Sequence, residues 1–375
     1  MTEPSHTVHL ELQGPALARA LRKTRPLHLV YRLPVSSRYG YHSLKYPVSC
    51  RNLARWVRAW PLVTTPARQV VFLDTETTGL LVGPGTYAFL IGAGVFEENH
   101  FAMHQFFMPH PGYEPTMLRW LNRFLARRAI VITFNGRSFD MPLLASRYVM
   151  NRLPLGTEAL LHVDLLPLCR RFWRDRLDGC SLGRLEEGVL GLARTDADIP
   201  GRDIPDLYRR FVLQQDGELA GVLYHNRMDL ASMAVLYEQL ATLADNPRES
   251  TGADDDVALS RLYLAIGNLF RAIYCVERAQ ERGPLSRIHL PFLAELAQCC
   301  RNHGQMLRAR RLYRLMAGMG DFHAMMALAK DFEHNRKRYA RAMTWCRRAA
   351  ALQLNTKQAH SLQRRIERLQ RKLKH

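Results

Sequence analysis

Several features that mark secreted, zinc-binding or membrane proteins are missing from this chain of 375 residues. Seven residues are cysteine, an odd number, and none has the Cys-x-x-Cys spacing, so the sequence indicates neither a disulfide framework nor a zinc ribbon. No segment reaches the roughly 18 uninterrupted apolar residues of a membrane span. Residues 1–9 lack the charged start and apolar stretch of a signal peptide. We therefore expect a cytoplasmic protein with no membrane partner.

Acidic residues are also scarce relative to basic ones. The chain has 34 Asp and Glu against 53 Lys and Arg, a formal net charge of +19. The excess is uneven: residues 1–66 hold 10 basic and 2 acidic residues, residues 67–250 hold 19 and 22, and residues 251–375 hold 24 and 10. This charge predicts an anionic partner, and nucleic acid is favoured over a membrane surface. The basic flanks would supply nonspecific attraction to it. Docking on a ribosome or another acidic partner, or mere solubility, is compatible with the same charge.

The most informative stretch is a hydrophobic run that ends in two carboxylates, VVFLDTETTG at residues 70–79. Its apolar start predicts a central strand, and the period of two places Asp74 and Glu76 on the same face. Like charges held so close raise each other's pKa and destabilise the fold unless a cation neutralises them, which indicates a divalent metal site. A strand that leaves the core into a solvated Thr-Gly turn would explain the same pair.

Two motifs downstream carry further acids. Residues 129–134 predict another buried strand, followed by a tight Asn-Gly turn and a helix that opens near Ser138 with Asp140 in its first turn. In the third motif His225 and Asp229 lie four residues apart and share one helix face. Each motif has a structural alternative. Asp140 would complement a helix N-terminus, and the other two residues would form a surface pair.

Taken together, the order D-x-E, FNGRSFD and H-x-x-x-D resembles the DEDD superfamily of 3′-to-5′ exonucleases, which have an RNase H-like fold. The segments FLDTETTGL, FNGRSFD and HNRMDL, with residues 180–186 and 198–201 between them, are most similar to the YprB-like branch of RNase H-like predicted nucleases, over about residues 68–245. The resemblance implies that four acids bind metal and act in catalysis, and that His225 is the general base. These four acids are Asp74, Glu76, Asp140 and Asp229.

The last motif departs from the better-known patterns, in which either a His is separated from the final Asp by four intervening residues or a Tyr is separated from it by three. Here the identities are exchanged, because four residues separate Tyr224 from Asp229 and three residues separate His225 from it. We favour His225, since i,i+4 geometry aligns it with Asp229 and imidazole titrates near neutral pH whereas a phenol does not. Tyr224 would instead position a phosphate or pack, and the assignment between the two stays open.

Three other polar residues near these motifs need separate interpretations. Thr77 and Asn135 are candidates for substrate contacts, although turn formation by Asn-Gly is a competing explanation for Asn135. Asp164 follows a short apolar run and is expected to cap the next helix, residues 165–173, rather than to bind metal.

The resemblance implies a DEDD-type nuclease that hydrolyses phosphodiester bonds of single-stranded DNA or RNA from the 3′ end. Two Mg²⁺ or Mn²⁺ ions would lower the pKa of an attacking water and stabilise the leaving oxygen. Four carboxylates without cysteine favour these hard ions over a structural zinc. The alternative is a noncatalytic nucleic-acid-binding or scaffold protein on the same fold. DNA and RNA, and exonuclease and endonuclease activity, are all left open.

The pattern along the chain predicts an α/β fold, an RNase H-like mixed β-sheet flanked by helices. Residues 1–45 are basic, contain several prolines and are expected to be partly ordered. Asp74 and Glu76 are placed on the central strand, with the other acids on helices nearby. The expected helices cover residues 53–60, 113–127 and 138–150, and the expected strands cover residues 70–73, 87–96, 100–108, 129–134 and 161–164.

From about residue 251 the composition becomes helical. Arg-Ala pairs begin at Arg271, Arg308 and Arg341, which stand 37 and 33 residues apart, near the roughly 34-residue tetratricopeptide (TPR) period. Seven residues beyond each Ala comes a mostly small side chain that would let paired helices approach closely: Ala279, Met316 and Ala349.

This pattern resembles an all-α TPR-like helical repeat ending in a basic helix over residues 354–374, with generic helical hairpins as the alternative. Its groove would hold a protein partner or guide nucleic acid. The expected domains are a basic N-terminal extension (1–66), an RNase H-like exonuclease domain (67–247) and a TPR-like domain (257–375).

Overall fold

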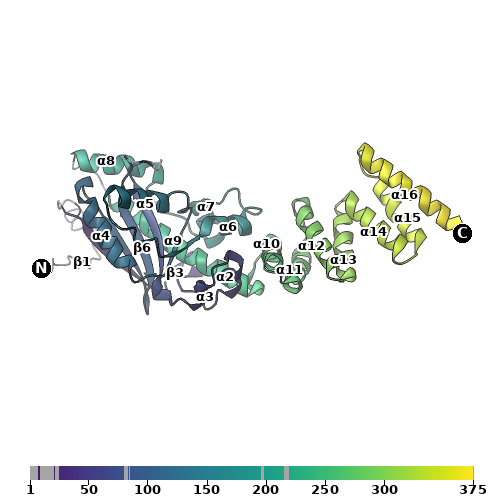
Figure 1. The fold of residues 1–375 in the computed structure, drawn as a ribbon, viewed down its shortest axis with the longest axis horizontal. Coiled ribbons are helices and arrows are strands. Elements are labelled where there is room, and N and C mark those ends of the chain that lie inside the picture. The colour runs from purple at the N-terminus through teal and green to yellow at the C-terminus, as the bar shows by residue number, and fades with distance from the viewer. Residues whose placement is uncertain are drawn as a thin grey trace. The chain divides into compact units, whose positions relative to one another are not determined.

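The chain forms two compact units, residues Met1–Glu249 and Ser250–His375. The first is built around a seven-stranded sheet and the second from consecutive helices (Figure 1). Among the described residues, no helix combines the length and the apolar character needed to cross a membrane. The computed structural model describes residues 7–8, 21, 25–79, 83, 85–195, 198–214 and 219–374.

The elements of the first unit have the following bounds. Its strands are β1 (Thr7–Val8), β2 (Leu27–Pro34), β3 (Arg38–Tyr39), β4 (His42–Ser43), β5 (Val70–Thr77), β6 (Ala88–Phe96), β7 (His100–Phe107), β8 (Ile130–Thr133) and β9 (Leu161–Asp164). Its helices are α2 (Arg51–Val57), α3 (Pro61–Thr64), α4 (Glu114–Leu125), α5 (Asp140–Met150), α6 (Leu165–Trp173), α7 (Leu182–Leu185), the π-helical turn η3 (Glu186–Leu190), α8 (Ile204–Gln214) and α9 (Ala220–Asp245).

The large sheet is mixed, with the strand order β1-β2-β7-β6-β5-β8-β9. Strand β5 pairs antiparallel with β6, and β6 pairs antiparallel with β7, whereas β8 is parallel to β5 and β9 is parallel to β8. Strand β5 therefore lies inside the sheet, between β6 and β8. The predicted mixed sheet with helices beside it is confirmed.

Strand β2 was not predicted, although residues 1–45 were expected to be partly ordered. It pairs with β7 along eight residues, and its side chains Leu27, Leu29 and Val30 are buried. These residues form a strand because their apolar side chains have a sheet face to cover, and Pro26 before the strand does not interrupt its hydrogen bonds. Residues 1–6, 9–20 and 22–24 of the predicted segment lie outside the described residues.

Helices pack on both faces of the sheet around β5. Val71 and Leu73 belong to one buried cluster with Leu118 of α4, whereas the ring of Phe72 contacts the ring of Tyr237 in α9, with centroids 5.9 Å apart. The alternation of a strand separates these side chains onto opposite faces. Because both faces are covered, polar residues at the end of β5 lie close to helices that follow much later in the sequence.

The second unit consists of helical hairpins in sequence order. Helices α10 and α11 pack together, as do α12 and α13, and α14 and α15, while α16 packs on α15 (Figure 1). Their bounds are α10 (Ala253–Ala265), α11 (Leu269–Arg282), α12 (Leu290–Asn302), α13 (Met306–Gly318), α14 (Phe322–His334), α15 (Tyr339–Ala350) and α16 (Thr356–Lys374).

The repeat positions identified in the sequence occupy equivalent places in these hairpins. Ala272, Ala309 and Ala342 each lie in the first turns of the second helix of a pair, and all three are fully buried. The residues seven positions later, Ala279, Met316 and Ala349, are buried as well. The helical C-terminal region is thus consistent with the expected TPR-like arrangement, with small residues where paired helices meet.

Candidate metal and catalytic site

Three elements position the four predicted acids. Asp74 and Glu76 follow each other on one face of β5, and the register of β5 with β6 shifts directly after Glu76. Asp140 is the first residue of α5, and Asp229 lies in the third turn of the long helix α9. Acids separated by up to 155 residues in sequence therefore meet at β5, since α9 packs against this strand and Thr75 of β5 donates a hydrogen bond to Asp140 at the start of α5.

The electrostatics indicate that these four carboxyl groups share one small volume. Burial raises the pKa of Asp74 well above its ordinary value, and the charges of Asp229 and Asp140 raise it further. Burial and then the charges of Asp74, Asp229 and Asp140 likewise raise the pKa of Glu76. Burial also raises the pKa of Asp140, to about 6, and that of Asp229. A cluster of carboxyls that repel one another in this way is stabilised by a cation.

Asp74 is held in place by a residue of α9. The side-chain amide of Asn226 donates to Asp74 Oδ2 at 2.8 Å, and Gln105 Nε2 of β7 donates to Asn226 Oδ1 at 2.9 Å. Asn226 is fully buried and lies directly over Gly92 of β6, where an added Cβ would be 2.3 Å from Asn226 Oδ1. The glycine thus permits α9 to approach the sheet closely enough to fix the Asp74 carboxylate.

Asp229 is engaged by an arginine from the segment that precedes α8. Arg194 donates to both oxygens of the buried Glu186 at 2.6 and 2.7 Å, to Asp198 at 3.2 Å, and to Asp229. Burial alone would lower the pKa of Arg194, but hydrogen bonds and charges from Glu186 and Asp229 raise it above its ordinary value. The guanidinium group therefore supplies positive charge at one side of the carboxylate cluster.

His225 lies beside Asp229 as the four-residue spacing predicts. Its Nε2 is 3.6 Å from Asp229 Oδ2, while its Nδ1 is 2.8 Å from Asp198 Oδ1 and 3.0 Å from Arg194 Nη1. Arg194 can only donate, so Nδ1 either accepts from Arg194 or donates to Asp198; when it donates to Asp198, the Nε2 lone pair is free to accept a proton. The hydroxyl of Tyr224 instead accepts a hydrogen bond from Thr195 at 3.5 Å.

The residues present fit a divalent cation in their chemistry, because four carboxylates offer the hard oxygen ligands that such ions prefer. Within the described part of the chain, no three Asp, Glu, His or Cys side chains are arranged to coordinate a metal as they stand. Three of the carboxylates are turned to protein donors instead. Asn226 donates to Asp74, Thr75 donates to Asp140 at 2.5 Å, and Arg194 donates to Asp229.

A cleft of about 400 Å³ opens next to the acids. Asp74 and Asp229 line one part of it, and the exposed Arg170 of α6 lines another. The arginine offers a positive group to an anion that enters the cleft beside the carboxylates. The remaining lining residues are Phe134, Asn135, Leu166, Cys180, Ser181 and Leu182.

The structure places the other predicted residues as follows. Asn135 lines the cleft and adopts the left-handed conformation (φ 64°) of a tight turn, so the turn interpretation and the substrate interpretation are compatible. Asp164 caps α6 through Leu166 N–H at 3.0 Å and accepts from Asn135 N–H at 2.8 Å, which is the structural role expected of it. Thr77 donates to the Gly79 carbonyl at 2.7 Å, and neither Thr77 nor Tyr224 lines the cleft.

Sequence reasoning missed three residues of the site: Asn226, Arg194 and Arg170. Asn226 directly follows His225, and its amide in a helix whose buried face is mostly apolar was a signal for a buried partner. Arg194 lies four residues before Asp198, a spacing that suggests an ion pair but says nothing of Asp229. Arg170 had no local signal.

Comparisons with known proteins agree with the fold described above. The model of the RNase_H superfamily matches residues 71–241, from β5 into α9. The chain is 31% identical over 359 residues to "Uncharacterized protein YprB" of Bacillus subtilis (strain 168), covering 90% of this chain and 84% of that protein. Among solved structures, the family B DNA polymerase of Pyrobaculum calidifontis is 15% identical with a TM-score of 0.36. That match covers 56% of this chain and 30% of the polymerase, a similarity too low to support any inference.

Proposed function

Because the chain belongs to the YprB family and carries an RNase H superfamily domain, we propose that it is a metal-dependent nuclease of the DEDD type, acting as a 3′-to-5′ exonuclease on single-stranded DNA or RNA. The expected fold class, an RNase H-like mixed sheet followed by a helical C-terminal region, is confirmed. The observation that carries the proposal is the cluster of four mutually repelling carboxyl groups at the end of β5.

In this proposal Asp74, Glu76, Asp140 and Asp229 hold two Mg²⁺ or Mn²⁺ ions. Bound ions of this kind supply a nucleophilic water at neutral pH and stabilise the charge that develops on the leaving oxygen. Burial of Glu76 and Asp140 and partial burial of Asp74 and Asp229 support the assignment, since desolvated carboxylates interact more strongly with a cation than exposed ones do. Asn226 orients Asp74 within this set.

His225 is proposed as the general base. Asp198 lies 2.8 Å from Nδ1 and fixes the ring so that Nε2 faces the side of Asp229. A proton taken from the attacking water would reside on Nε2, and the resulting imidazolium would be stabilised by Asp198 and Asp229. Tyr224 is the less favoured base, since its hydroxyl is directed to Thr195.

The cleft supplies contacts for the substrate. Arg170 is proposed to bind a phosphate next to the scissile bond, because it is the exposed cation of the cleft and shares the cleft with Asp74 and Asp229. Asn135 and Ser181 are proposed to hydrogen-bond the nucleotide from the other lining segments. Thr77 lies on β5 directly after Glu76 and is proposed as a weaker contact at the strand end.

One observation favours the alternative, a noncatalytic nucleic-acid-binding protein. Arg194 donates to Asp229 and places a fixed positive charge where a metal ligand is proposed. In a protein that has given up catalysis, this guanidinium would replace the metal permanently. In a nuclease, the Asp229 oxygens must also be available to an ion.

Hydrolysis of end-labelled oligonucleotides separates the two functions. Wild-type protein, Asp74→Asn and Asp229→Asn are incubated with 3′- and 5′-labelled single-stranded DNA and RNA in Mg²⁺, Mn²⁺ or EDTA. We expect metal-dependent shortening from the 3′ end, lowered at least about 100-fold in both variants, because a metal ligand contributes several kcal/mol to the transition state.

Asp206→Asn is the matched control, since it removes an exposed carboxylate of α8 that pairs with Arg209 at 3.1 Å. This variant should keep the wild-type rate. Binding of the oligonucleotides without cleavage in either metal would support the alternative function, and internal cuts would change the proposal to an endonuclease.

A further inference from the structure

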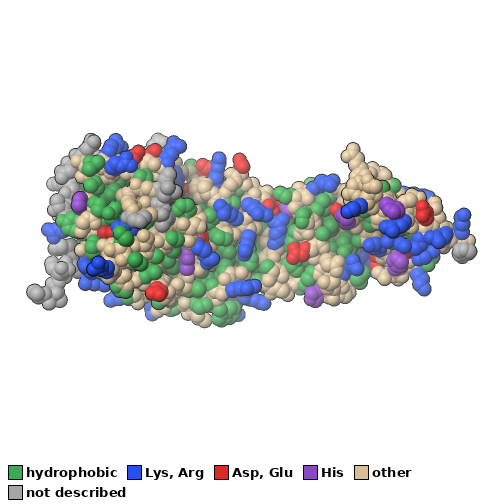
Figure 2. Space-filling view, turned by 45° about the horizontal axis from the view of Figure 1, so that its top comes forward, with side chains coloured by type: hydrophobic (Ala, Val, Ile, Leu, Met, Phe, Trp, Pro, Cys, Tyr) green, Lys and Arg blue, Asp and Glu red, His purple; other side chains and the backbone are tan. Residues whose placement is uncertain are grey.

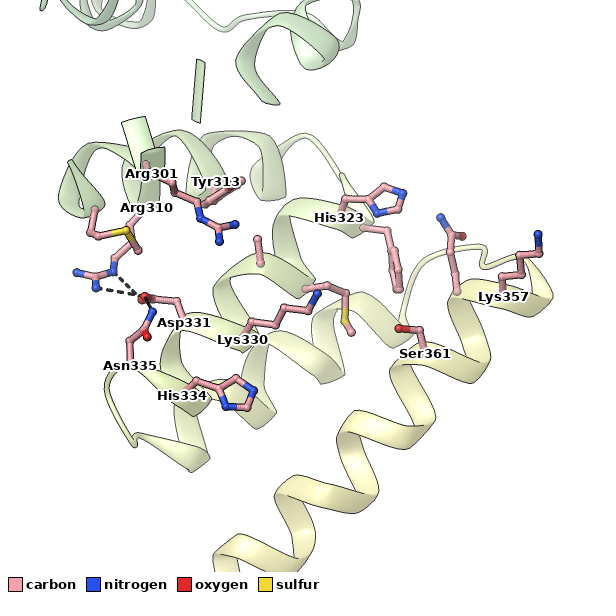
Figure 3. A pocket seen from close by; sticks show the side chains of 16 residues that line it. Arg301, Arg310, Tyr313, His323, Lys330, Asp331, His334, Asn335, Lys357 and Ser361 are labelled. Carbon is pink, nitrogen blue, oxygen red and sulfur yellow. Dashed lines mark hydrogen bonds and ion pairs between the residues drawn. The ribbon is translucent and has the colours of Figure 1, made fainter. Parts of the chain in front are cut away.

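The second unit contains a groove of about 510 Å³ between α12, α13, α14 and the start of α16. Figure 3 shows Arg301, Lys330 and His334 extending from α12 and α14 over this groove, with His323 and Lys357 at its other end. Basic or amide side chains thus come from four helices, and Phe322 and Met326 form part of the groove floor.

Most of the positive charge in the groove is not neutralised by the protein. Arg301, Lys330 and Lys357 are exposed and have no ion-pair partner among residues 219–374. The one carboxylate of the groove, Asp331, accepts two hydrogen bonds from Arg310, at 2.6 and 3.2 Å. An anion entering the groove would therefore meet free cations and no free carboxylate.

The surrounding sequence extends this field. Residues 301–375 contain 19 Lys and Arg but four Asp and Glu. Asp331 pairs with Arg310, the buried Glu333 accepts from Arg365 at 2.5 Å, and Asp321 caps α14. On the face drawn in Figure 2, blue Lys and Arg side chains predominate over red ones along the C-terminal helices. Positive charge therefore extends beyond the groove, and a polymeric anion that leaves the groove would still meet basic side chains.

Ring side chains accompany these cations. Tyr313 is half-buried in the groove wall, while His323 and His334 are exposed at the groove. Flat rings next to cations suit unstacked bases joined by phosphates, since bases stack on rings while Lys and Arg follow the backbone. An acidic peptide would use the cations but not the rings.

We propose that this groove is a second nucleic-acid-binding site, which takes the phosphate backbone and bases of a single strand independently of the carboxylate cluster. The inference deepens the proposed function, since a nuclease with such a site would retain its substrate through contacts outside the cleft.

The test measures binding of the full-length protein to fluorescent single-stranded oligonucleotides in EDTA, where no hydrolysis takes place. Arg301→Gln/Lys330→Gln/Lys357→Gln is compared with Arg314→Gln/Arg341→Gln/Arg347→Gln, which removes three exposed charges of the same unit outside the groove. We expect the groove variant to weaken binding at least about tenfold. Its slope of log K against log salt should fall by about 2, because each phosphate contact contributes roughly 0.7. The control variant should change much less.

Equal loss of affinity in the two variants would overturn the proposal, as nonspecific charge would then explain binding. Preferential, groove-dependent binding of a poly-glutamate peptide would overturn it in favour of a protein partner. Groove-dependent binding by a wild-type protein that cleaves nothing in Mg²⁺ or Mn²⁺ would support the groove while removing the nuclease. If the wild-type protein cleaves a short oligonucleotide but the groove variant binds as tightly as the wild type, the nuclease would be supported and the groove proposal overturned. Circular dichroism of both variants verifies the fold.

Discussion

Asn226 donates a hydrogen bond to Asp74 across 152 residues of sequence, and the same amide accepts one from Gln105. A single side chain of α9 thereby joins the candidate metal site to two strands of the sheet. The geometry of the site therefore depends on how α9, the longest described helix of the first unit, packs on the sheet. Changes at this contact should affect stability and metal binding together.

Asn226→Ala tests this coupling. Loss of the amide leaves Asp74 without its donor and removes one acceptor of Gln105, so unfolding should become easier by about 1–3 kcal/mol. Mn²⁺ affinity should fall about 10- to 100-fold, because Asp74 is no longer oriented. Denaturant unfolding and calorimetric Mn²⁺ titration measure the two effects. Asn122→Ala, which removes a donor to the Pro154 carbonyl, should change stability without changing metal affinity.

Gly92→Ala tests the close approach of α9 to β6. The new methyl group would lie 2.3 Å from Asn226 Oδ1, so the helix or the amide must shift, at a cost of about 1–3 kcal/mol. Gly183→Ala is the matched control, since an added Cβ meets no atom within 4 Å there and the residue lies in helix α7. The control should be neutral or stabilising by up to about 1 kcal/mol. Equal unfolding midpoints for the two variants would show that the Asn226 contact is dispensable.

The sequence was sufficient where a local signal determines the structure. The apolar run before Asp164 and the capping side chain predicted β9 and α6 with the observed bounds, and the apolar run from Val70 predicted β5. The buried Ala and Met positions of the repeats were likewise visible as a spacing. Each of these features follows from a short run of residues or from a regular spacing that can be read directly in the sequence.

What the sequence did not predict depends on partners far along the chain. Strand β2 was missed because its stability comes from pairing with β7, some 70 residues later. Periodicity placed Asp229 on a helix face, but it carried no information that Arg194 would meet that face together with Glu186. Tertiary contacts of this kind have no local pattern.

Asp140 provides a pH-dependent test of the cluster. Its pKa is raised to about 6 from an ordinary value near 3.8, first by burial, so the folded protein binds this proton more tightly than the unfolded chain does. The group therefore lowers stability as the pH rises from about 4 through 6, and fully so above that range. In EDTA, Asp140→Asn should raise the unfolding free energy at pH 7.5 by up to about 3 kcal/mol. At pH 4 the gain should largely disappear. Urea unfolding at the two pH values measures this, and an equal gain at both would contradict the raised pKa.

Arg194 and Glu186 form a second test, because both are largely withdrawn from water and joined by two hydrogen bonds. Arg194→Met leaves the buried Glu186 unpaired and should cost about 3–5 kcal/mol. In Arg194→Met/Glu186→Gln the loss should be smaller than the sum of the single variants by about 0.5–3 kcal/mol, as a double-mutant cycle would show. Arg184→Met removes an exposed partner of Glu187 and should cost under about 1 kcal/mol. Strict additivity would mean that the two residues do not stabilise one another.

Glu333 gives the second unit its own acid sensitivity. Burial alone would raise its pKa, but hydrogen bonds from Arg368 and Lys372 and the charge of Arg365 lower it to about 2. A depressed carboxyl pKa stabilises the folded state above the unfolded value near 4.5, and this contribution is lost as the pH falls toward 2.

Glu333→Gln should therefore lower the unfolding free energy by on the order of 3 kcal/mol at pH 7 and progressively less below pH 4.5. Helical circular dichroism during urea unfolding of the full chain, at pH 7, 4.5 and 3, measures the change. Glu367→Gln removes an exposed carboxylate of α16 that accepts from Gln363 at 2.9 Å, and it should have little effect at any pH. If the loss for Glu333→Gln stayed constant from pH 7 to pH 3, its three cations would stabilise α16 by packing rather than through the carboxylate, because a charge-dependent contribution must vanish when the carboxyl is protonated.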